Sequence, residues 1–298
     1  MELLFSRLQD LITGLSAKVQ VEVIMVDDHS TDATPSVIQN QLSKYPWLKS
    51  IRLSRNSGSH VAIIAGMQHC NGDAAVFLAA DLQDPPELIH NMLRQWEAGF
   101  DVVWAVRTKR LKVSPLSVWL SNSFYRLFNW STDVKFPAKG ADYALLDRKA
   151  VDGLIASTGS KPSLGMLIAW MGFKSTEIEY VKEERKFGRS KWTLRKKLNA
   201  FADAFVGFSY LPMRVMTYTG FVASLLGFLY AIIVFVMRFM VGDPIPGYAS
   251  LMIVVLIIGG LQMLMLGVLG EYLWRNLEES RKRPLYLIEE KNGFDSKP

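Results

Sequence analysis

An acidic loop in the first third of the chain carries residue types suited to binding a metal ion. The apolar run Ala74–Ala80 predicts a buried strand, and Asp81, Gln83 and Asp84 come directly after it. Carboxylate and amide oxygens are hard ligands, which suit a Mg²⁺ or Mn²⁺ ion that substrate phosphates also hold. An ordinary turn between a strand and a helix is rich in the same residues, because they cap helices. The loop alone leaves both interpretations open.

Polar side chains also follow three other predicted strands: Asp27 and Asp28 after residues 19–26, Arg55 and Asn56 after residues 50–53, and Arg107 after residues 101–106. Because the carboxyl ends of parallel strands lie at one edge of a sheet, we expect these loops to share one rim. Acids suit a ribose or a metal ion and arginines suit phosphates, so together they indicate a nucleoside-diphosphate site. The sequence has no Gly-rich phosphate-binding fingerprint, which argues against P-loop enzymes and Rossmann dehydrogenases.

The elements that must position these loops alternate along the first part of the chain. Helices are predicted over residues 2–15, 61–70, 86–98, 116–128, 148–157 and 161–171, with another capped by Ser30 or Thr31, and strands over 19–26, 50–53, 74–80, 101–106, 140–146 and 175–181. Apolar strands separated by helices predict an α/β fold with a doubly wound, mostly parallel, Rossmann-like sheet. We interpret Asp147 and Arg148 as a helix-capping pair rather than as site residues.

The composition changes after residue 181. From Lys182 to Lys197 there are eight basic and two acidic residues, a net charge of +6 that equals the formal excess of the whole chain. Over residues 194–208, apolar side chains recur every three or four positions. An apolar stripe beside basic residues is typical of a helix in a membrane interface. A core helix of a soluble domain is the alternative.

Two later segments are long enough to cross a bilayer. Val215–Met237 is 23 residues without a charge, and Tyr248–Gly270 is another 23 in which Gln262 is the one amide. A helix of about 20 apolar residues spans the hydrocarbon core. Basic residues flank the outer ends, so the positive-inside rule predicts cytoplasmic termini and an external link. Two buried helices of a soluble protein are the alternative.

Composition agrees with a membrane protein that meets anionic partners. Half of the residues are apolar and the formal charge is +6, which favours phosphates or a membrane surface. Cys70 is the single cysteine of the chain, so an intramolecular disulfide and a soft-metal cluster are excluded. The first 15 residues are amphipathic, and we expect no signal peptide.

The acidic loops resemble motifs of the family 2 glycosyltransferases with the GT-A fold. Residues 26–34 resemble V-D/N-D-x-S-x-D-x-T, and Arg55 to Gly58 with Ala62 and Gly66 resemble R-N-x-G…A…G. Residues 81–87, D-L-Q-D-P-P-E, are similar to the D-A-D-L-Q-D-P-P-E of the polyprenyl-phosphate branch. Residues 140–148 and 184–192 match two later motifs. Residues 267–272 with Arg283-Pro284 resemble the two-span tail of bactoprenol glucosyltransferases and relatives of dolichol-phosphate-mannose synthase.

The resemblance implies transfer of one sugar, with inversion, from a UDP- or GDP-sugar (UDP-glucose favoured) to undecaprenyl or dolichyl phosphate at the cytoplasmic face, with Mg²⁺ or Mn²⁺. The resemblance implies that Asp27 and Asp28 bind the nucleoside and that Asp81 and Gln83 bind the metal. It implies that the donor phosphates are bound by Arg185, Arg189, Ser190 and Lys191. Arg107 and Arg126 would bind the acceptor phosphate, and Asp142 with Asp81 would serve catalysis. A phosphate monoester is already mostly ionised at pH 7, so Asp142 is expected to orient the acceptor and the metal rather than to take a proton. For Arg126, a surface charge is the alternative.

Two departures from the family pattern bear on the site. The family begins with a strand, typically I-V-I-P-x-Y-N-E, whereas this chain begins directly at the helix that follows it. Either the true start lies upstream of this sequence, or the protein lacks a central strand. Lack of this strand would expose strand edges and remove half of the base pocket. The second departure is Ala79, where relatives often carry the first acid of the metal motif. The metal then depends on Asp81 and Gln83.

These observations predict four regions: a catalytic domain over 1–190, an interfacial helix over 191–212, two transmembrane helices within 213–275, and a cytoplasmic tail over 276–298. We expect an integral protein of a bacterial inner membrane, with no nucleic-acid partner. Small residues in the spans permit close packing of helices within one chain or between chains, so the sequence is compatible with a homo-oligomer. A catalytically inactive relative that only binds membrane or partners is the alternative function. A processive polysaccharide synthase is disfavoured, because it needs a Q-x-x-R-W motif and more spans.

Overall fold

The computed structural model describes residues 1–16, 18–107, 137, 141–159, 164–181, 211–241 and 247–294. The chain divides into two compact units. The first, which we call the α/β unit, contains residues 1–200 together with 283–298, and the second, the helical unit, contains residues 201–282. The predicted helix over 116–128 lies outside the described residues, and so does the predicted interfacial helix over 191–212 up to residue 210, whereas residues 211 and 212 begin a later helix.

The α/β unit alternates strands and helices as predicted. Its helices are α1 (Glu2–Leu15), α2 (Thr34–Leu42), α3 (Ser59–His69), the 3-10 turn η1 (Pro86–Leu88), α4 (Ile89–Glu97), α6 (Arg148–Ala156) and α7 (Leu164–Trp170). Its strands are β1 (Val23–Asp27), β2 (Leu48–Leu53), β3 (Ala74–Phe77), β4 (Val102–Arg107), β5 (Ala141–Asp147), β6 (Ser175–Tyr180) and β7 (Ile288–Asn292). The sequence analysis did not identify β7.

The strands form two mixed sheets. One has the order β1-β2-β7 and the other β3-β5-β4-β6. β1 pairs in parallel with β2, and β4 with β6, whereas β5 runs antiparallel to both of its neighbours and β7 antiparallel to β2. The predicted α/β class is correct. The antiparallel members differ from a mostly parallel sheet because an apolar run indicates a buried strand without indicating its direction.

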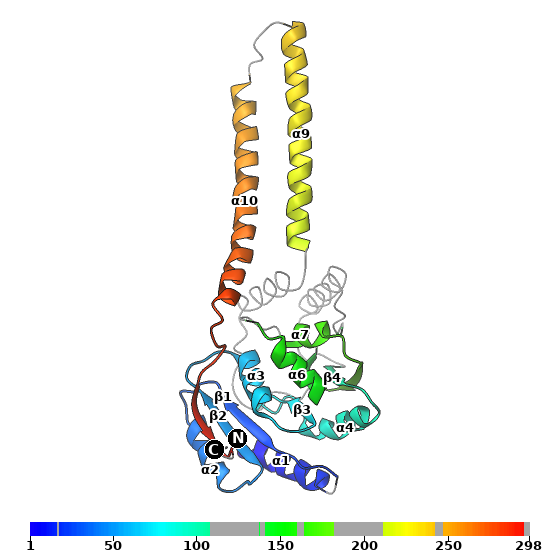
Figure 1. Cartoon of the computed structure of the whole chain (residues 1–298), viewed down its shortest axis with the longest axis vertical. Helices are drawn as coiled ribbons and strands as arrows, with labels where there is room; N and C mark the ends of the chain where they lie inside the picture. Colours follow the sequence, from blue (N-terminus) through cyan, green and yellow to red (C-terminus); the bar gives the residue numbers. More distant parts are fainter. Residues whose placement is uncertain are drawn as a thin grey trace. The chain divides into compact units, whose positions relative to one another are not determined.

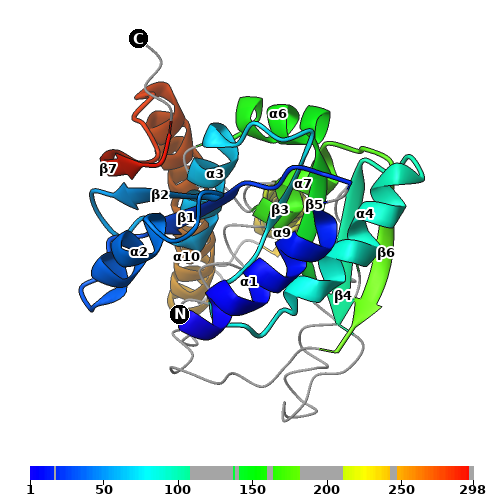
Figure 2. The same ribbon diagram turned by 90° about the horizontal axis from the view of Figure 1, so that it is seen from below.

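Helices cover both faces of these sheets. The helix α3 contacts β1 and α6, and α6 contacts β3 and β5, so one helical layer joins the two sheets. The helices α1, α2 and α4 lie on the opposite face (Figures 1 and 2). Among the described strands, β1 ends one sheet and β3 ends the other.

The core of the larger sheet lies on β4 and β5. Every residue from Val102 to Val106 is buried, and so are Tyr143 to Leu146 on the neighbouring strand. In contrast, β1 is only half-buried over residues 23–26, although its sequence is equally apolar. The difference follows from position, because β5 lies between two strands whereas β1 ends its sheet.

Several boundaries differ from the sequence predictions. β1 begins at Val23 rather than Val19, and β3 ends at Phe77 rather than Ala80. The expectation that Ser30 or Thr31 caps the next helix is wrong, because α2 begins at Thr34. The backbone N–H of Thr34 donates to Asp32 instead, at 2.9 Å.

The capping role predicted for Asp147 is confirmed. Asp147 is the N-cap of α6, and its carboxylate accepts a hydrogen bond from the N–H of Lys149 at 3.0 Å. The other carboxylate oxygen accepts from the indole N–H of Trp96 at 2.8 Å. The carboxylate therefore joins α4 to the start of α6.

The helical unit consists of α9 (Leu211–Val241) and α10 (Tyr248–Ser280). Within them, Met213–Met237 and Ile257–Ser280 are long and apolar enough to cross a membrane, and neither segment is buried inside the protein. Large apolar side chains such as Phe221, Phe228 and Phe235 are exposed on α9. Exposure of this extent is unfavourable in water, and it agrees with helices whose surroundings are lipid.

Candidate functional site

The loop after β3 holds the predicted metal residues. Asp81 lies four residues beyond the end of β3, and its carboxylate accepts a hydrogen bond from the N–H of Gln83 at 3.2 Å. Leu82, between them, has a positive φ of 59° and is only 4% exposed. Its side chain packs against Leu4 and Leu8 of α1. This burial offsets the cost of a left-handed backbone at a non-glycine residue.

Two contacts fix the rest of this loop. Asp84 is buried and accepts a hydrogen bond from the hydroxyl of Tyr180 at the end of β6. Glu87 accepts two hydrogen bonds from Arg7 of α1, at 2.6 and 2.9 Å. The Arg7 hydrogen bond holds the pKa of Glu87 below its usual value. Both contacts hold the loop on the carboxyl-terminal side of Asp81.

The surroundings of Asp84 form a buried polar cluster. Burial raises the pKa of Tyr180, and the hydrogen bond to Asp84 raises it further. Arg107 lies opposite Tyr180 in the register of β4 and β6. Tyr143 of β5 is fully buried with its ring centroid 6.5 Å from that of Tyr180, and burial raises its pKa above the ordinary range. Both phenols therefore stay neutral, and Tyr180 serves as a hydrogen-bond donor.

The oxygen ligands on this loop fit a metal ion shared with a substrate. Within the described residues, no group of three or more His, Cys, Asp or Glu side chains could hold a metal. Asp81 and Gln83 offer one carboxylate and one amide. Mg²⁺ usually binds in this way, with one or two protein ligands and the remainder from water and substrate phosphates.

A second cluster joins the loops after β1 and β2. The carboxylate of Asp28 accepts hydrogen bonds from the N–H groups of Ser57 and Gly58, at 2.6 and 2.8 Å. Gly58 has a φ of 94°, a conformation that glycine adopts without steric cost. Because α3 begins at Ser59, Asp28 stabilises the loop that leads into this helix.

Asp27 lies beside Asp28 and is buried. Its carboxylate accepts hydrogen bonds from the N–H of Ser30, at 2.9 Å, and from the guanidinium of Arg52. The parallel register places Asp27 opposite Arg52. The carboxylates of both acids are therefore oriented by protein donors, while each oxygen keeps a lone pair for a ligand.

The predicted site residues lie at strand ends of both sheets. Asp81, Gln83 and Arg107 belong to the loops of the larger sheet, and Asp27 and Asp28 to those of the smaller sheet. Leu82 belongs to the apolar cluster of α1 against which Val23 and Met25 of β1 also pack.

The remaining predicted residues cannot be placed relative to these clusters. Asp142 lies in β5, and its side chain lies outside the described part of the structure. Arg126 and the basic segment fall outside the described residues: Arg185, Arg189, Ser190 and Lys191.

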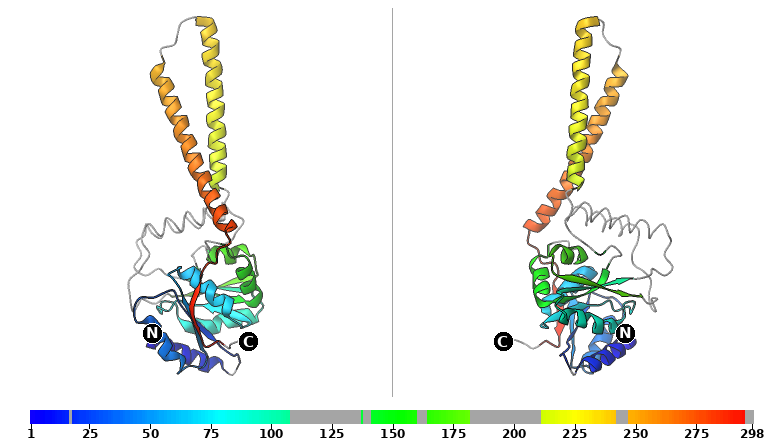
Figure 3. Two further views of the ribbon diagram at one scale, coloured as in Figure 1. Left: turned by 60° about the vertical axis from the view of Figure 1, so that its left-hand side comes forward. Right: turned by 90° about the vertical axis from the view of Figure 1, so that its right-hand side faces the viewer.

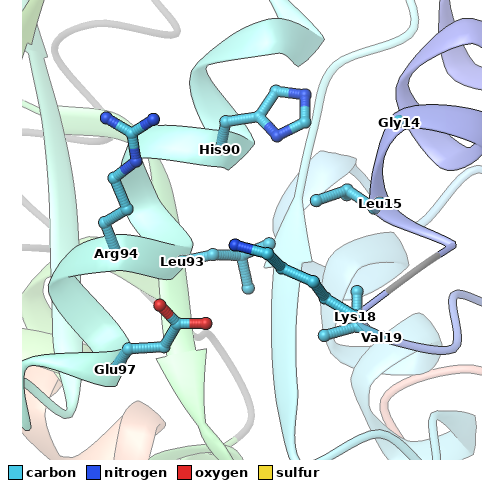
Figure 4. Close-up of a pocket in the computed structure, with 8 residues that line it drawn as sticks. All are labelled: Gly14, Leu15, Lys18, Val19, His90, Leu93, Arg94 and Glu97. Carbon is cyan, nitrogen blue, oxygen red and sulfur yellow. The ribbon is translucent and has the colours of Figure 1, made fainter.

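A small cavity lies elsewhere in the α/β unit. It has a volume of about 110 Å³ and opens between the end of α1 and α4 (Figure 4). Lys18, His90, Arg94 and Glu97 line it with apolar neighbours. None of the predicted site residues lines this cavity, so it is separate from both clusters.

Both units match known protein families. Residues 6–154 match the profile described as "Glycosyl transferase family 2", and residues 211–275 match the "GtrB C-terminal hairpin". The chain belongs to glycosyl transferase family 2. The match covers half of the chain, including both acidic clusters, and the hairpin match covers α9 and most of α10. This glycosyltransferase therefore has the GT-A-type fold that the sequence predicted.

Several relatives are similar over most of their length. "Uncharacterized glycosyltransferase YkcC" of Bacillus subtilis (strain 168) is 37% identical over 98% of this chain and 90% of its own. "Bactoprenol glucosyl transferase" of Shigella phage SfV is 34% identical over 90% of this chain and 88% of its own. A solved mannosyltransferase, PcManGT from Pyrobaculum calidifontis in complex with GDP-Man and Mn2+, has a TM-score of 0.42 and 21% identity. That likeness covers 62% of this chain and about half, 52%, of the other.

Several residues that shape the site of this glycosyltransferase were not predicted. The sequence shows Asp84 as an acid of the loop, but it does not indicate the partner of Asp84, because Tyr180 lies 96 positions away. Arg52 and Glu289 are separated by 237 positions. The sequence signal for Arg52 is its charge within β2, where Arg52 and Lys49 are the two residues that are not fully buried.

Proposed function

We propose that this glycosyltransferase transfers one sugar, with inversion, from a nucleotide-diphosphate sugar to a polyprenyl phosphate, with UDP-glucose favoured as donor and undecaprenyl or dolichyl phosphate as acceptor. The observation that carries this proposal is the 34% identity with a bactoprenol glucosyl transferase over 90% of the chain. The likeness includes the hairpin as well as the family 2 part. Two helices able to cross a membrane would keep the α/β unit close to a lipid acceptor.

Asp81 and Gln83 would hold a Mg²⁺ or Mn²⁺ ion together with the donor phosphates. When bound, such an ion offsets the negative charge that develops on the leaving diphosphate. The protein's own contribution is the fixed loop: the Tyr180 and Arg7 contacts leave Asp81 little freedom to move. Preorganised ligands of this kind need no rearrangement when the donor binds.

The remaining roles follow the family pattern. Asp27 and Asp28 would contact the nucleoside, and Arg107 with Arg126 would bind the acceptor phosphate. Guanidinium groups suit both phosphates because they bind two oxygens at once. The donor phosphates would be enclosed by residues of the basic segment: Arg185, Arg189, Ser190 and Lys191. Asp142 would orient the acceptor, since a phosphate monoester is largely ionised at pH 7.

The membrane arrangement completes the proposal. Residues 1–190 would act at the cytoplasmic face, residues 191–212 would lie in the interface, and α9 and α10 would span the membrane. The tail over 276–298 would return to the cytoplasm, as the positive-inside rule predicts. Packing of the spans between chains into a homo-oligomer is compatible with their small residues.

A nucleotide-binding experiment distinguishes an active enzyme from the alternative function, that of a catalytically inactive relative. The purified full chain should bind UDP more tightly with Mn²⁺ than without it in isothermal titration calorimetry. Asp81→Ala should abolish the metal-dependent part, whereas Asp10→Ala, which removes an exposed acid on α1, should leave it unchanged. Binding that is independent of both the metal and Asp81 would favour the inactive relative.

A further inference from the structure

The last described residues of the chain are part of the α/β unit. Although they follow α10 in the sequence, residues 288–292 form β7, which pairs antiparallel with β2 (Figure 3, left). Tyr286 and Ile288 pack on the cluster around Ile51 and Leu53. The ring of Phe294 lies 5.2 Å from the ammonium of Lys49. The tail is therefore an integral edge of the smaller sheet.

This tail places a carboxylate next to the loop of Asp27. Oε2 of Glu289 accepts a hydrogen bond from Nε of Arg52 at 2.9 Å, and it lies 3.3 Å from Nδ1 of His29. The same guanidinium donates through its other nitrogens to the carboxylate of Asp27 and to the backbone oxygen of Ser30, the latter at 3.3 Å. Arg52 therefore connects Glu289 directly to Asp27.

The geometry of Arg52 makes this connection directional. A guanidinium is planar and presents its donors in fixed directions. With Nε bound to Glu289, the plane of the guanidinium is set, and the terminal nitrogens point at Asp27 and Ser30. Without Glu289, the side chain of Arg52 gains rotational freedom. The carboxylate of Asp27, which is buried, then loses a well-oriented partner.

We propose that Glu289 is a positioning residue of the donor site: it orients Arg52 and, through Arg52, the carboxylate of Asp27. The proposal rests on the proposed function, in which Asp27 contacts the nucleoside of the donor. Its consequence is that a residue beyond both apolar helices helps to determine donor affinity.

The adjacent residue Glu290 supplies a matched control. It lies on the same strand, carries the same charge and is exposed, and its side chain makes no polar contact within the described residues. Glu289→Gln and Glu290→Gln therefore remove the same charge from the same strand. They differ in whether the contact with Arg52 is lost.

The test measures donor affinity in the full chain. Glu289→Gln should raise the Kd for UDP with Mn²⁺, and the KM for UDP-glucose, about two- to five-fold, the range for a half-exposed charged pair. It should leave kcat and the melting temperature close to those of Glu290→Gln. In an Arg52→Gln background, Glu289→Gln should add nothing further, because its effect passes through Arg52.

Two results would overturn the proposal while leaving the function intact. In the first, the wild-type chain binds UDP, and the Glu289→Gln and Glu290→Gln variants have the same Kd for UDP. The other is an effect of Glu289→Gln that persists in full when Arg52 is absent. If the wild-type chain binds no UDP at all, the proposed donor is wrong instead, so the two failures are distinguished.

Discussion

At the scale of single residues, the loop at Asp81 depends on side chains that would not themselves touch a substrate. Asp84 is buried with the Tyr180 hydroxyl as donor, and Leu82 keeps a left-handed backbone because its side chain is buried. Gln83 lies between these two anchors, and Asp81 directly precedes Leu82. The loop therefore acts as a preorganised unit whose geometry is determined by its surroundings.

Removing the Tyr180 hydroxyl tests this view. Tyr180→Phe removes one hydrogen-bond donor to the buried Asp84, and a hydrogen bond to a charged group contributes about 1.5–3 kcal/mol. We expect a decrease of that size in the free energy of unfolding, measured by denaturant titration, together with weaker Mn²⁺-dependent UDP binding.

Tyr45→Phe is the matched control for this substitution. Tyr45 stacks on Phe5 and Trp47, and its hydroxyl makes no hydrogen bond within the described residues. Loss of the Tyr45 hydroxyl should change neither the free energy of unfolding nor the Mn²⁺-dependent binding of UDP. Equal effects of the two substitutions would contradict the role of the Tyr180 hydroxyl.

The pair between Arg7 and Glu87 predicts a dependence on pH. Because its pKa is lowered in the folded state, Glu87 stabilises the fold above its unfolded pKa, and this contribution is lost as the pH falls through the folded value. The pair is half-exposed, so solvent screening reduces its contribution to about 0.5 kcal/mol. Glu87→Gln should be less stable than wild type at pH 7, and the difference should shrink as the pH falls from 7 to 3. A difference that is equal at both pH values would exclude this pair as its source.

At the scale of elements, the sequence determined which segments are strands and helices better than how they pair. The alternation of apolar runs predicted β1 to β6 within a few residues, because buried strands and amphipathic helices have distinct periods. The antiparallel direction of β5 was not predictable from its composition. β7 was missed because residues 288–292, I-E-E-K-N, carry three charges and form an edge strand with little buried surface.

The turn after β7 provides a test of the tail as a structural element. Gly293 has a φ of 79°, and a Cβ added there would lie 2.9 Å from the backbone oxygen of Leu48. Gly293→Ala should therefore combine backbone strain with a clash. Gly99→Ala is the control, since Gly99 has a φ of 86° but its nearest neighbour would be the Lys174 ammonium at 3.9 Å.

Strain alone costs about 1–2 kcal/mol when a side chain is placed in the left-handed region. Both variants should show that loss of stability in denaturant titrations, and Gly293→Ala should lose at least about 1 kcal/mol more. Equal losses of stability in the two variants would mean that the tail moves away from the clash at no cost in free energy, and that β7 is only weakly held against β2.

At the scale of the whole molecule, the fold could be recognised from motifs that are spread over most of the chain. The site could be recognised only in part. Asp27, Asp28, Asp81 and Gln83 lie on the loops predicted for them, but the contacts that orient them come from residues distant in sequence.

The membrane arrangement can be tested through the link between the two apolar helices. In a Cys70→Ser background, Pro244→Cys should react with a membrane-impermeant maleimide in intact cells, because the link is predicted to lie outside. A cysteine in place of Ser280, at the end of α10, should react only after the membrane is permeabilised. The opposite pattern would reverse the predicted orientation.

The most direct test of the central claim is sugar transfer itself. Membranes that contain the full chain should convert undecaprenyl phosphate and radiolabelled UDP-glucose into a labelled glycolipid. The product should require Mg²⁺ or Mn²⁺ and disappear in Asp81→Ala. The contradicting result is no labelled lipid from UDP-glucose, other UDP-sugars or GDP-mannose, in membranes where an added bactoprenol glucosyl transferase makes the product.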